Sequence, residues 1–189
     1  MGRFGGSRLA GAGALALLLS ACAGGNVRPV SDTPVKIGKP YKIRGTTYVP
    51  EADPGYDMLG YASWYGSESG NVTSLGERFR PEWMTAAHRT LPLPTYVEVT
   101  ALDTGRRILV RINDRGPFGA SKRIIDLSRG AAELLGVKTQ GLARVRVQRV
   151  EPSSKDRDRL RRGKHARDLA PVSGRVLQNL RAQFLNAGL

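Results

Sequence analysis

Apolar and polar residues alternate along four short segments of the chain, and this period of two predicts β-strands. The predicted strands are residues 59–65, 96–102, 106–112 and 142–150. The clearest is the third, in which basic and apolar residues interleave until a polar turn closed by Gly-Pro. The second and third strands are joined by Asp103-Thr104-Gly105, which predicts a tight hairpin because glycine adopts a positive φ at little cost.

One segment breaks this alternation and has the signals of a short helix. Ser128 can cap a helix over residues 129–135, and Gly136 can end it. Short strands, Gly/Pro turns and a single short helix favour a small β-barrel. We therefore place one compact domain at residues 56–150.

The N-terminus has the pattern of a secretory signal. Residues 1–8 carry two arginines and no acidic residue, and residues 9–19 are apolar but too short to span a bilayer. The following Leu19-Ser20-Ala21-Cys22 resembles the bacterial lipobox, in which the signal peptide is cut before a cysteine that becomes lipidated. We predict a signal peptide at 1–21 and a lipid anchor on Cys22, the alternative being a secretory signal with an incidental cysteine.

The compartment follows from this prediction. A lipid-anchored chain would lie in the bacterial cell envelope. Ala23, in place of Asp, favours the outer membrane facing the periplasm, by the sorting rule of enterobacterial lipoproteins. Cys22 is the only cysteine, so the chain cannot form an intramolecular disulfide.

Two segments flank the predicted domain. Residues 22–55 are rich in Gly, Pro, Thr and Lys, which predicts a tether, although 36–43 and 46–49 look extended and could lie against the domain. Residues 151–189 first alternate Arg, Lys and Asp without an apolar face, and then show apolar residues at helical spacing. This favours a solvated, partly disordered tail, with a peripheral helix that contacts a membrane or a polyanion as the alternative.

The net charge limits the partners. Thirty Lys and Arg against 16 Asp and Glu give +14, which favours nucleic acid, anionic lipid head groups or another anionic polymer. Export argues against nucleic acid and leaves the membrane surface and cell-wall polymers.

The candidate chemistry centres on Asp114, a carboxylate at the mouth of a strand between Asn113 and Arg115. Glu77 follows a glycine in a loop, and His88 precedes a Pro-rich bend. We find no metal-ligand spacing, no phosphate-binding glycine loop and no nucleophile elbow, so we expect no metal and no cofactor. Carboxylates with one histidine suit general acid–base chemistry on a glycosidic or other acetal bond.

Trp64 and Tyr65 close the first predicted strand. Each could pack in the core, which is the commoner outcome for a tryptophan. Each could instead form a platform for sugar rings, which present apolar C–H faces to aromatic side chains.

Five sequence motifs together resemble one known family. They are GYASWYG at 60–66, GE at 76–77, MTAAHRTLPLP at 84–94, VRINDRGP at 110–117 and RIIDLS at 123–128. Their order and spacing are similar to those of the rare lipoprotein A family, a lipoprotein family with a double-psi β-barrel domain. The resemblance covers residues 56–150 and implies a mainly β fold, a six-stranded double-psi barrel with one or two short helices and flexible tails.

The resemblance also implies a function. Active family members are peptidoglycan lytic transglycosylases that cut between N-acetylmuramic acid and N-acetylglucosamine, leave a 1,6-anhydro end and prefer peptide-stripped strands. The alternatives are a non-catalytic glycan-binding lipoprotein that links the outer membrane to the wall, and a structural partner of other wall or division proteins. By the resemblance, Asp114, Glu77 and His88 match the residues of the family site, and we take them as catalytic. As our own hypothesis, the substrate-binding residues are Trp64, Tyr65, Asn113 and Arg115.

The chain departs from the family pattern in two places. The loop at 67–76 lacks the usual aromatic residue, and Leu75 replaces the usual asparagine, which puts substrate positioning in doubt. The 39 residues after Val150 are too few and too polar to form the SPOR domain with which many members bind denuded glycan at the septum. We therefore do not expect recruitment by that route.

Overall fold

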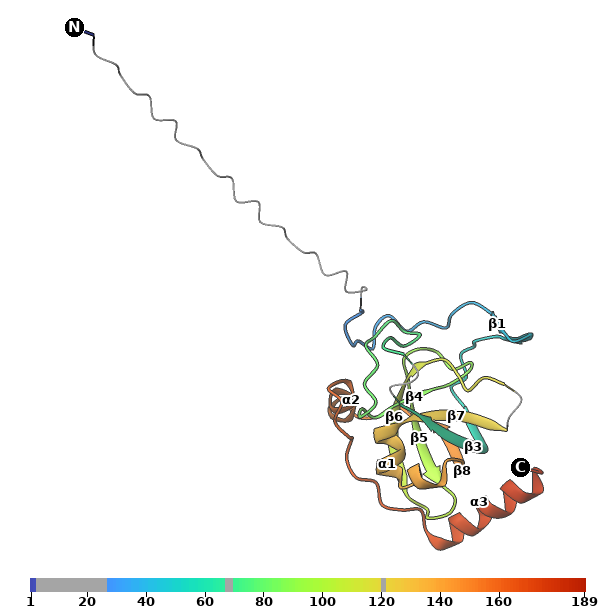
Figure 1. The fold of residues 1–189 in the computed structure, drawn as a ribbon. Helices are drawn as coiled ribbons and strands as arrows, with labels where there is room; N and C mark the ends of the chain where they lie inside the picture. Colours follow the sequence, from blue (N-terminus) through green and yellow to red (C-terminus); the bar gives the residue numbers. More distant parts are fainter. Residues whose placement is uncertain (3–26, 67–69, 120–121) are drawn as a thin grey trace.

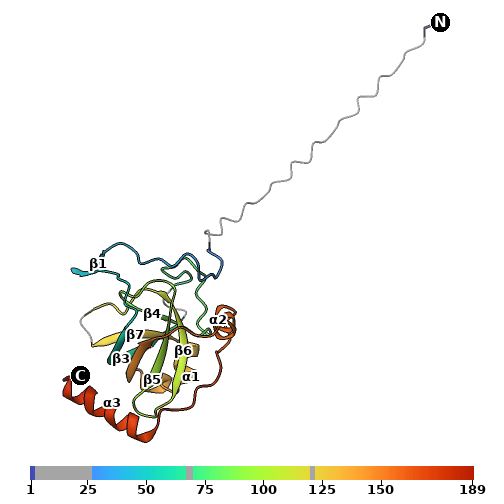
Figure 2. The same ribbon diagram turned by 180° about the vertical axis from the view of Figure 1, so that it is seen from behind.

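The computed structural model describes residues 1–2, 27–66, 70–119 and 122–189. Six strands close into a barrel in the order β3-β7-β4-β6-β5-β8 (Figures 1 and 2), which confirms the predicted six-stranded barrel. The strands are β3 (Asp57–Tyr65), β4 (Thr85–Ala87), β5 (Thr95–Ala101), β6 (Arg107–Asp114), β7 (Arg123–Ser128) and β8 (Ala143–Arg149).

The four strands expected from alternation all form, with ends within two residues of the prediction. Alternation did not reveal β4 or β7. All three residues of β4 are buried, so the strand has no polar face to mark its period. The predicted hairpin between β5 and β6 is present, with Gly105 at φ +74° and its N–H donating to the Ala101 carbonyl over 2.8 Å.

The pairing of the strands brings two aspartates near each other. Strand β4 pairs in parallel with β6 and antiparallel with β7, and its register shifts between Ala86 and Ala87. As a result Ala87 lies opposite Asp114 on one neighbouring strand and opposite Asp126 on the other. With two strand spacings between them, the two Cα atoms are about 10 Å apart.

Apolar side chains fill the barrel, and helix α1 (Arg129–Leu135) closes one side of it. The predicted helix is confirmed with its caps: the Ser128 Oγ accepts from the Ala131 N–H, and Gly136 ends the helix at φ +82°. Gly130 fits because a Cβ there would lie only 2.2 Å from the Glu82 carbonyl oxygen. A short 3₁₀ helix, η2 (Lys138–Gln140), precedes β8.

The C-terminal tail corrects the favoured prediction. Instead of a solvated and partly disordered segment, it forms helices α2 (Ser154–Arg161) and α3 (Gly174–Asn186), both packed on the barrel. Leu160 of α2 is fully buried, and Phe184 of α3 contacts the Tyr61 ring edge-on at 5.2 Å between ring centroids. The prediction was wrong at α2 because this helix buries only two side chains, Leu160 and Asp156, so its sequence has no apolar stripe. Asp156 accepts a hydrogen bond from the Arg167 N–H. No helix in the described ranges is long and apolar enough to cross a membrane.

The segment before the barrel is docked from Arg28 onward. The Arg28 N–H donates to the Gly76 carbonyl over 2.7 Å, and Lys36 and Leu93 exchange backbone hydrogen bonds. The extended stretches expected here form a hairpin of β1 (Tyr41–Ile43) and β2 (Thr46–Tyr48). Residues 3–21 of the predicted signal peptide and Cys22 lie outside the described residues.

Candidate active site

A groove of about 470 Å³ opens where β4 and β6 end. Ala87 and Gly116 are its small residues, and a Cβ on Gly116 would lie 3.6 Å from the Ala87 Cβ. Because Gly116 has φ +139°, only glycine takes this conformation without strain. The polar and aromatic lining comprises Tyr65, Thr73, Ser74, Asp114, Arg115, Phe118 and Asp126.

Asp114 is half-buried in this groove and is held by one oxygen. Its Oδ1 accepts from the Ser74 N–H at 2.8 Å, the Ser74 hydroxyl at 2.6 Å and the Arg115 N–H at 2.8 Å. Among the described residues, no hydrogen bond reaches Oδ2. The carboxylate is therefore fixed in orientation while one oxygen is left for a ligand.

Asp126 is a second groove carboxylate, and it was not among the predicted site residues. Its Oδ1 accepts from the Ser63 hydroxyl at 2.5 Å and from Arg123 Nη1 at 3.0 Å. The sequence did carry a signal for it. Asp126 stands between the apolar residues Ile125 and Leu127, and a charged residue in such a setting is rarely buried without a partner or a role.

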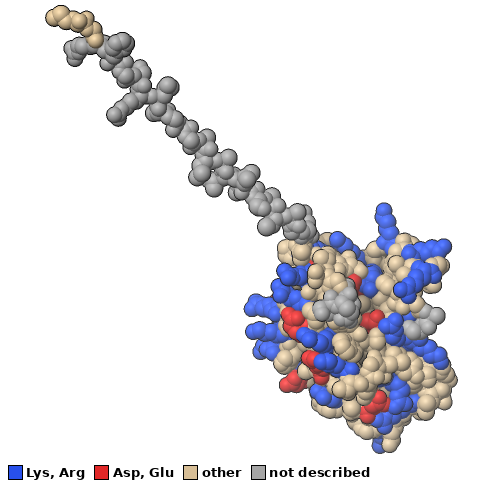
Figure 3. Space-filling model, in the orientation of Figure 1, with Lys and Arg blue, Asp and Glu red and all other residues tan. Residues whose placement is uncertain are grey.

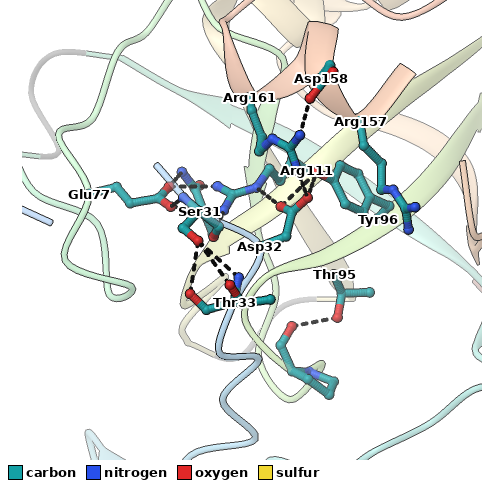
Figure 4. A network of polar contacts seen from close by, with 12 residues as sticks. Ser31, Asp32, Thr33, Glu77, Thr95, Tyr96, Arg111, Arg157, Asp158 and Arg161 are labelled. Carbon is teal, nitrogen blue, oxygen red and sulfur yellow. Dashed lines mark hydrogen bonds and ion pairs between the residues drawn. The ribbon is translucent and has the colours of Figure 1, made fainter. Parts of the chain in front are cut away.

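Glu77 lies outside the groove, in a buried ion pair (Figure 4). Arg111 grips both of its oxygens, with Nη1 to Oε2 at 2.6 Å and Nη2 to Oε1 at 2.9 Å, and Asn113 Nδ2 donates to Oε2 at 3.0 Å. Glu77 and Arg111 are each only 1% exposed. Burial alone would lower the pKa of Arg111, but the bonds to Glu77 outweigh it and raise that pKa. The pair ties the loop around Glu77 to β6.

His88 is also buried, and its ring holds the bend that follows it. Nδ1 accepts from the N–H groups of Thr90 at 3.2 Å and Leu91 at 3.0 Å. Two donors on Nδ1 place the ring proton on Nε2, which lies 2.9 Å from the Tyr56 hydroxyl oxygen. Burial, together with the positive charges of Arg115 and Arg89, lowers the pKa of His88 to about 3. The imidazole is therefore neutral near pH 7.

The four predicted substrate-binding residues divide into two groups. Tyr65 and Arg115 line the groove, Tyr65 stacking on Phe79 at 4.8 Å between ring centroids. Trp64 lies outside the lining, with Nε1 donating to the Lys138 carbonyl at 3.0 Å, and Asn113 is buried beside Glu77.

Arg115 is engaged by the protein itself. Its guanidinium donates to the carbonyls of His88, Leu91 and Ile37 at 3.2, 2.5 and 3.0 Å. It thereby ties the groove to the His88 bend and to the segment before the barrel.

The unusual loop is anchored in the part that the structure describes, from residue 70 onward. Leu75, which replaces the family asparagine, is 4% exposed and packs in the core. Its N–H donates to the Asn113 carbonyl over 3.2 Å, next to Asp114. The substitution therefore adds an apolar anchor, and Ser74 beside it reaches Asp114.

The groove can support proton transfer. Two carboxylates line the groove on either side of Ala87, with aromatic rings nearby, and paired carboxylates suit general acid–base catalysis. Within the described part of the chain, no group of three His, Cys, Asp or Glu side chains could hold a metal ion.

Comparison with known proteins identifies the barrel. The family model described as "Lytic transglycolase" matches residues 57–147. The endolytic peptidoglycan transglycosylase RlpA of Pseudomonas aeruginosa is 52% identical over 115 residues, which is 60% of this chain and 33% of that protein. The protein of the same name from Rickettsia felis is 45% identical over 117 residues, which is 60% of this chain and 51% of that protein. The one from Neisseria meningitidis is 46% identical over 114 residues, which is 59% of this chain and 47% of that protein.

The chain thus spans between a third and about half the length of these relatives. The matched residues coincide with the closed barrel and contain both groove aspartates. The barrel domain at residues 57–147 therefore belongs to the double-psi barrel family of lytic transglycosylases, and its sequence is similar to the rare lipoprotein A (RlpA) proteins.

Proposed function

We propose that this protein is an endolytic peptidoglycan lytic transglycosylase. It would cleave the bond between N-acetylmuramic acid and N-acetylglucosamine in peptide-stripped strands and leave 1,6-anhydro-N-acetylmuramic acid ends. The observation that carries the proposal is the groove in which Asp114 Oδ2 accepts no hydrogen bond from the described residues, while Asp126 lies on the other side of Ala87. The names of the relatives, endolytic peptidoglycan transglycosylases, support the reaction class.

The chemistry needs an acid and a base but no water. The acid protonates the glycosidic oxygen as its bond to C1 of the muramic acid breaks. The base removes the proton of the 6-hydroxyl of the same sugar, whose oxygen then bonds to C1. We assign both steps to Asp114, acting first as acid and then as base, with Asp126 orienting the 6-hydroxyl.

The remaining residues of the predicted site take supporting roles in this proposal. Glu77 and Asn113 position the loop that carries Ser74, because they are buried and bonded to each other. His88 supports the bend beside Arg115, since its ring is neutral and its Nδ1 is occupied. Tyr65 and Phe118 offer aromatic surface to the sugar. Trp64 stays a predicted substrate contact that lies outside the groove lining.

The test uses the full-length chain, purified in detergent, on sacculi whose stem peptides an amidase has removed. The wild type should release fragments with anhydro-muramic ends, detected by mass spectrometry. Asp114→Asn should reduce this release by at least about 100-fold, the scale on which loss of general acid catalysis is felt. Undiminished release by Asp114→Asn would refute the assignment of the acid. Asp103→Asn, at the far hairpin, is the matched control.

The alternative is a non-catalytic glycan-binding lipoprotein that links the membrane to the wall. The observation that favours it is the face drawn in Figure 3, on which Lys and Arg side chains are spread widely and Asp and Glu side chains are fewer. Such a surface suits retention on anionic wall polymers. Binding of wild-type protein to the treated sacculi without anhydro products would establish this alternative.

The envelope location belongs to the same proposal. A chain that acts on peptidoglycan works in the cell envelope, and a lipid on Cys22 would hold it at the membrane, in our proposal the outer membrane facing the periplasm. The docked segment supports a short connection, because only five residues separate Cys22 from Arg28 at the barrel.

A further inference from the structure

Asp32, outside the matched barrel domain, joins three elements that are distant in sequence (Figure 4). Its Oδ1 accepts from Arg111 Nε on β6 at 3.1 Å and from the Tyr96 hydroxyl on β5 at 2.8 Å. Its Oδ2 accepts from Arg161 Nη1 on α2 at 2.5 Å. One carboxylate thus connects the segment before the barrel, the barrel wall and the helix after it.

Asp32 accepts one of the hydrogen bonds that the buried Arg111 side chain donates. Its two Nη atoms hold Glu77, and Nη2 also donates to the Ser31 carbonyl at 2.6 Å. The Nε–H group donates to Asp32 Oδ1. Because the Arg111 side chain is 1% exposed, solvent cannot replace this partner. Asp32 also separates the positive charges of Arg111 and Arg161.

This network leads to the groove through the loop that contains Glu77. The Ser31 N–H lies 3.4 Å from Glu77 Oε1, and the Arg28 N–H donates to the Gly76 carbonyl. Within the loop, the Thr73 N–H donates to the Glu77 carbonyl at 2.9 Å. The loop is therefore clamped between β6 and the segment before the barrel, with Ser74 placed to make two of the three hydrogen bonds to Asp114.

We infer that Asp32 is a positioning residue for the reaction: it completes the Arg111–Glu77 pair so that the loop presents Ser74 to Asp114. The inference rests on the proposed function for its catalytic consequence. It also extends the working unit beyond residues 57–147, because Asp32 precedes the matched region and Arg161 follows it.

The first experiment measures kcat and KM on denuded glycan for full-length wild type, Asp32→Asn, Ser74→Ala and the double variant. We expect Asp32→Asn to lower kcat about tenfold and to change KM by less than about twofold, because misplacement of a reacting group slows chemistry more than binding. If both residues act on Asp114 along one path, the double variant will be no slower than the slower single variant. Multiplying effects, or an unchanged kcat in Asp32→Asn, would overturn the inference.

A second experiment does not depend on catalysis. Hydrogen exchange of the backbone amides at residues 73–77 should become faster in Asp32→Asn and not in Asp103→Asn, whose aspartate pairs with Arg144 at the far hairpin. Unchanged exchange would reject the clamp. If the wild type released no anhydro ends, the proposed function would fail, while the exchange result would still decide the positioning role.

A third variant covers the case in which Asp32→Asn does not fold. Arg161→Gln removes the outer partner of Asp32 and leaves the buried pair intact. It should give the same faster exchange and the same lack of additivity with Ser74→Ala, at a smaller loss of kcat. Wild-type exchange together with wild-type kcat in this variant would contradict the inference.

Discussion

The two ends of β6 are attached to the flanking segments by different kinds of contact. Where β6 ends, polar groups hold the groove loop: Glu77 and Arg111 are each 1% exposed and bond to each other and to the segment before the barrel. Where β6 begins, α3 is held mainly by an apolar cluster in which Phe184 and Leu180 pack against Leu102, and Arg181 adds two hydrogen bonds to backbone carbonyls of the hairpin. Directional polar bonds fix the angle of each group, whereas apolar contacts contribute stability without fixing an orientation. The polar end is therefore the one that can hold a carboxylate for chemistry.

The largest effect should come from breaking the polar end. Glu77→Ala leaves the Arg111 guanidinium buried without its main partner, and loss of one member of a buried pair costs about 3–5 kcal/mol. We expect that decrease in the free energy of unfolding in urea, together with loss of glycan cleavage. The exposed Glu82, changed to alanine, is the matched control and should alter unfolding by less than about 0.5 kcal/mol. An equally small change in Glu77→Ala would show that the network is not needed for stability.

A second prediction concerns pH and the bend at His88. Its pKa falls from 6.5 to about 3 on folding, so between these values the unfolded chain binds more protons than the native one. The stability from this residue is present above pH 6.5 and is lost as pH falls toward 3. When the pH falls from 6.5 to 4.5, the loss of this contribution should lower the free energy of unfolding by about 2 kcal/mol.

The comparison of variants isolates this contribution from other titrating groups. Urea unfolding at several pH values should show a shallower slope in His88→Asn than in the wild type. His165→Asn, which removes the exposed histidine of the tail, should keep the wild-type slope. Equal slopes in all three proteins would contradict a neutral, buried His88.

The sequence predicted the features that depend on neighbouring residues. The caps of α1, the hairpin at Gly105 and the position of Asp114 at a strand end follow from local spacing and turn chemistry. The family motifs supplied the closed barrel and named Glu77 and His88, but a motif carries residue types and not their surroundings. Whether a carboxylate faces solvent or a buried arginine depends on which strands pair.

The parts that could not be predicted depend on contacts far apart in the chain. Glu77 and Arg111 form an ion pair although they are 34 residues apart in the sequence, and Arg111 and Asp32 are 79 residues apart. Asp126 reaches the groove because β4 lies between β6 and β7, a strand order that no local pattern encodes. Helix α2 was not predicted because Leu160 is its only buried apolar residue.

The smallest effect should come from the apolar end. Phe184→Ala removes the ring that contacts Tyr61, and large core truncations cost about 3–5 kcal/mol when the site cannot relax. Here Phe184 packs in a small cluster apart from the main core, so we expect a loss below this range. Leu185→Ala, at the exposed neighbour, should change stability by less than about 0.5 kcal/mol. Because no polar contact of α3 reaches the groove residues described above, Phe184→Ala should leave kcat on denuded glycan within about twofold of the wild type. A large fall in kcat would mean that the apolar end also positions the site, and the division between the two ends of β6 would not hold.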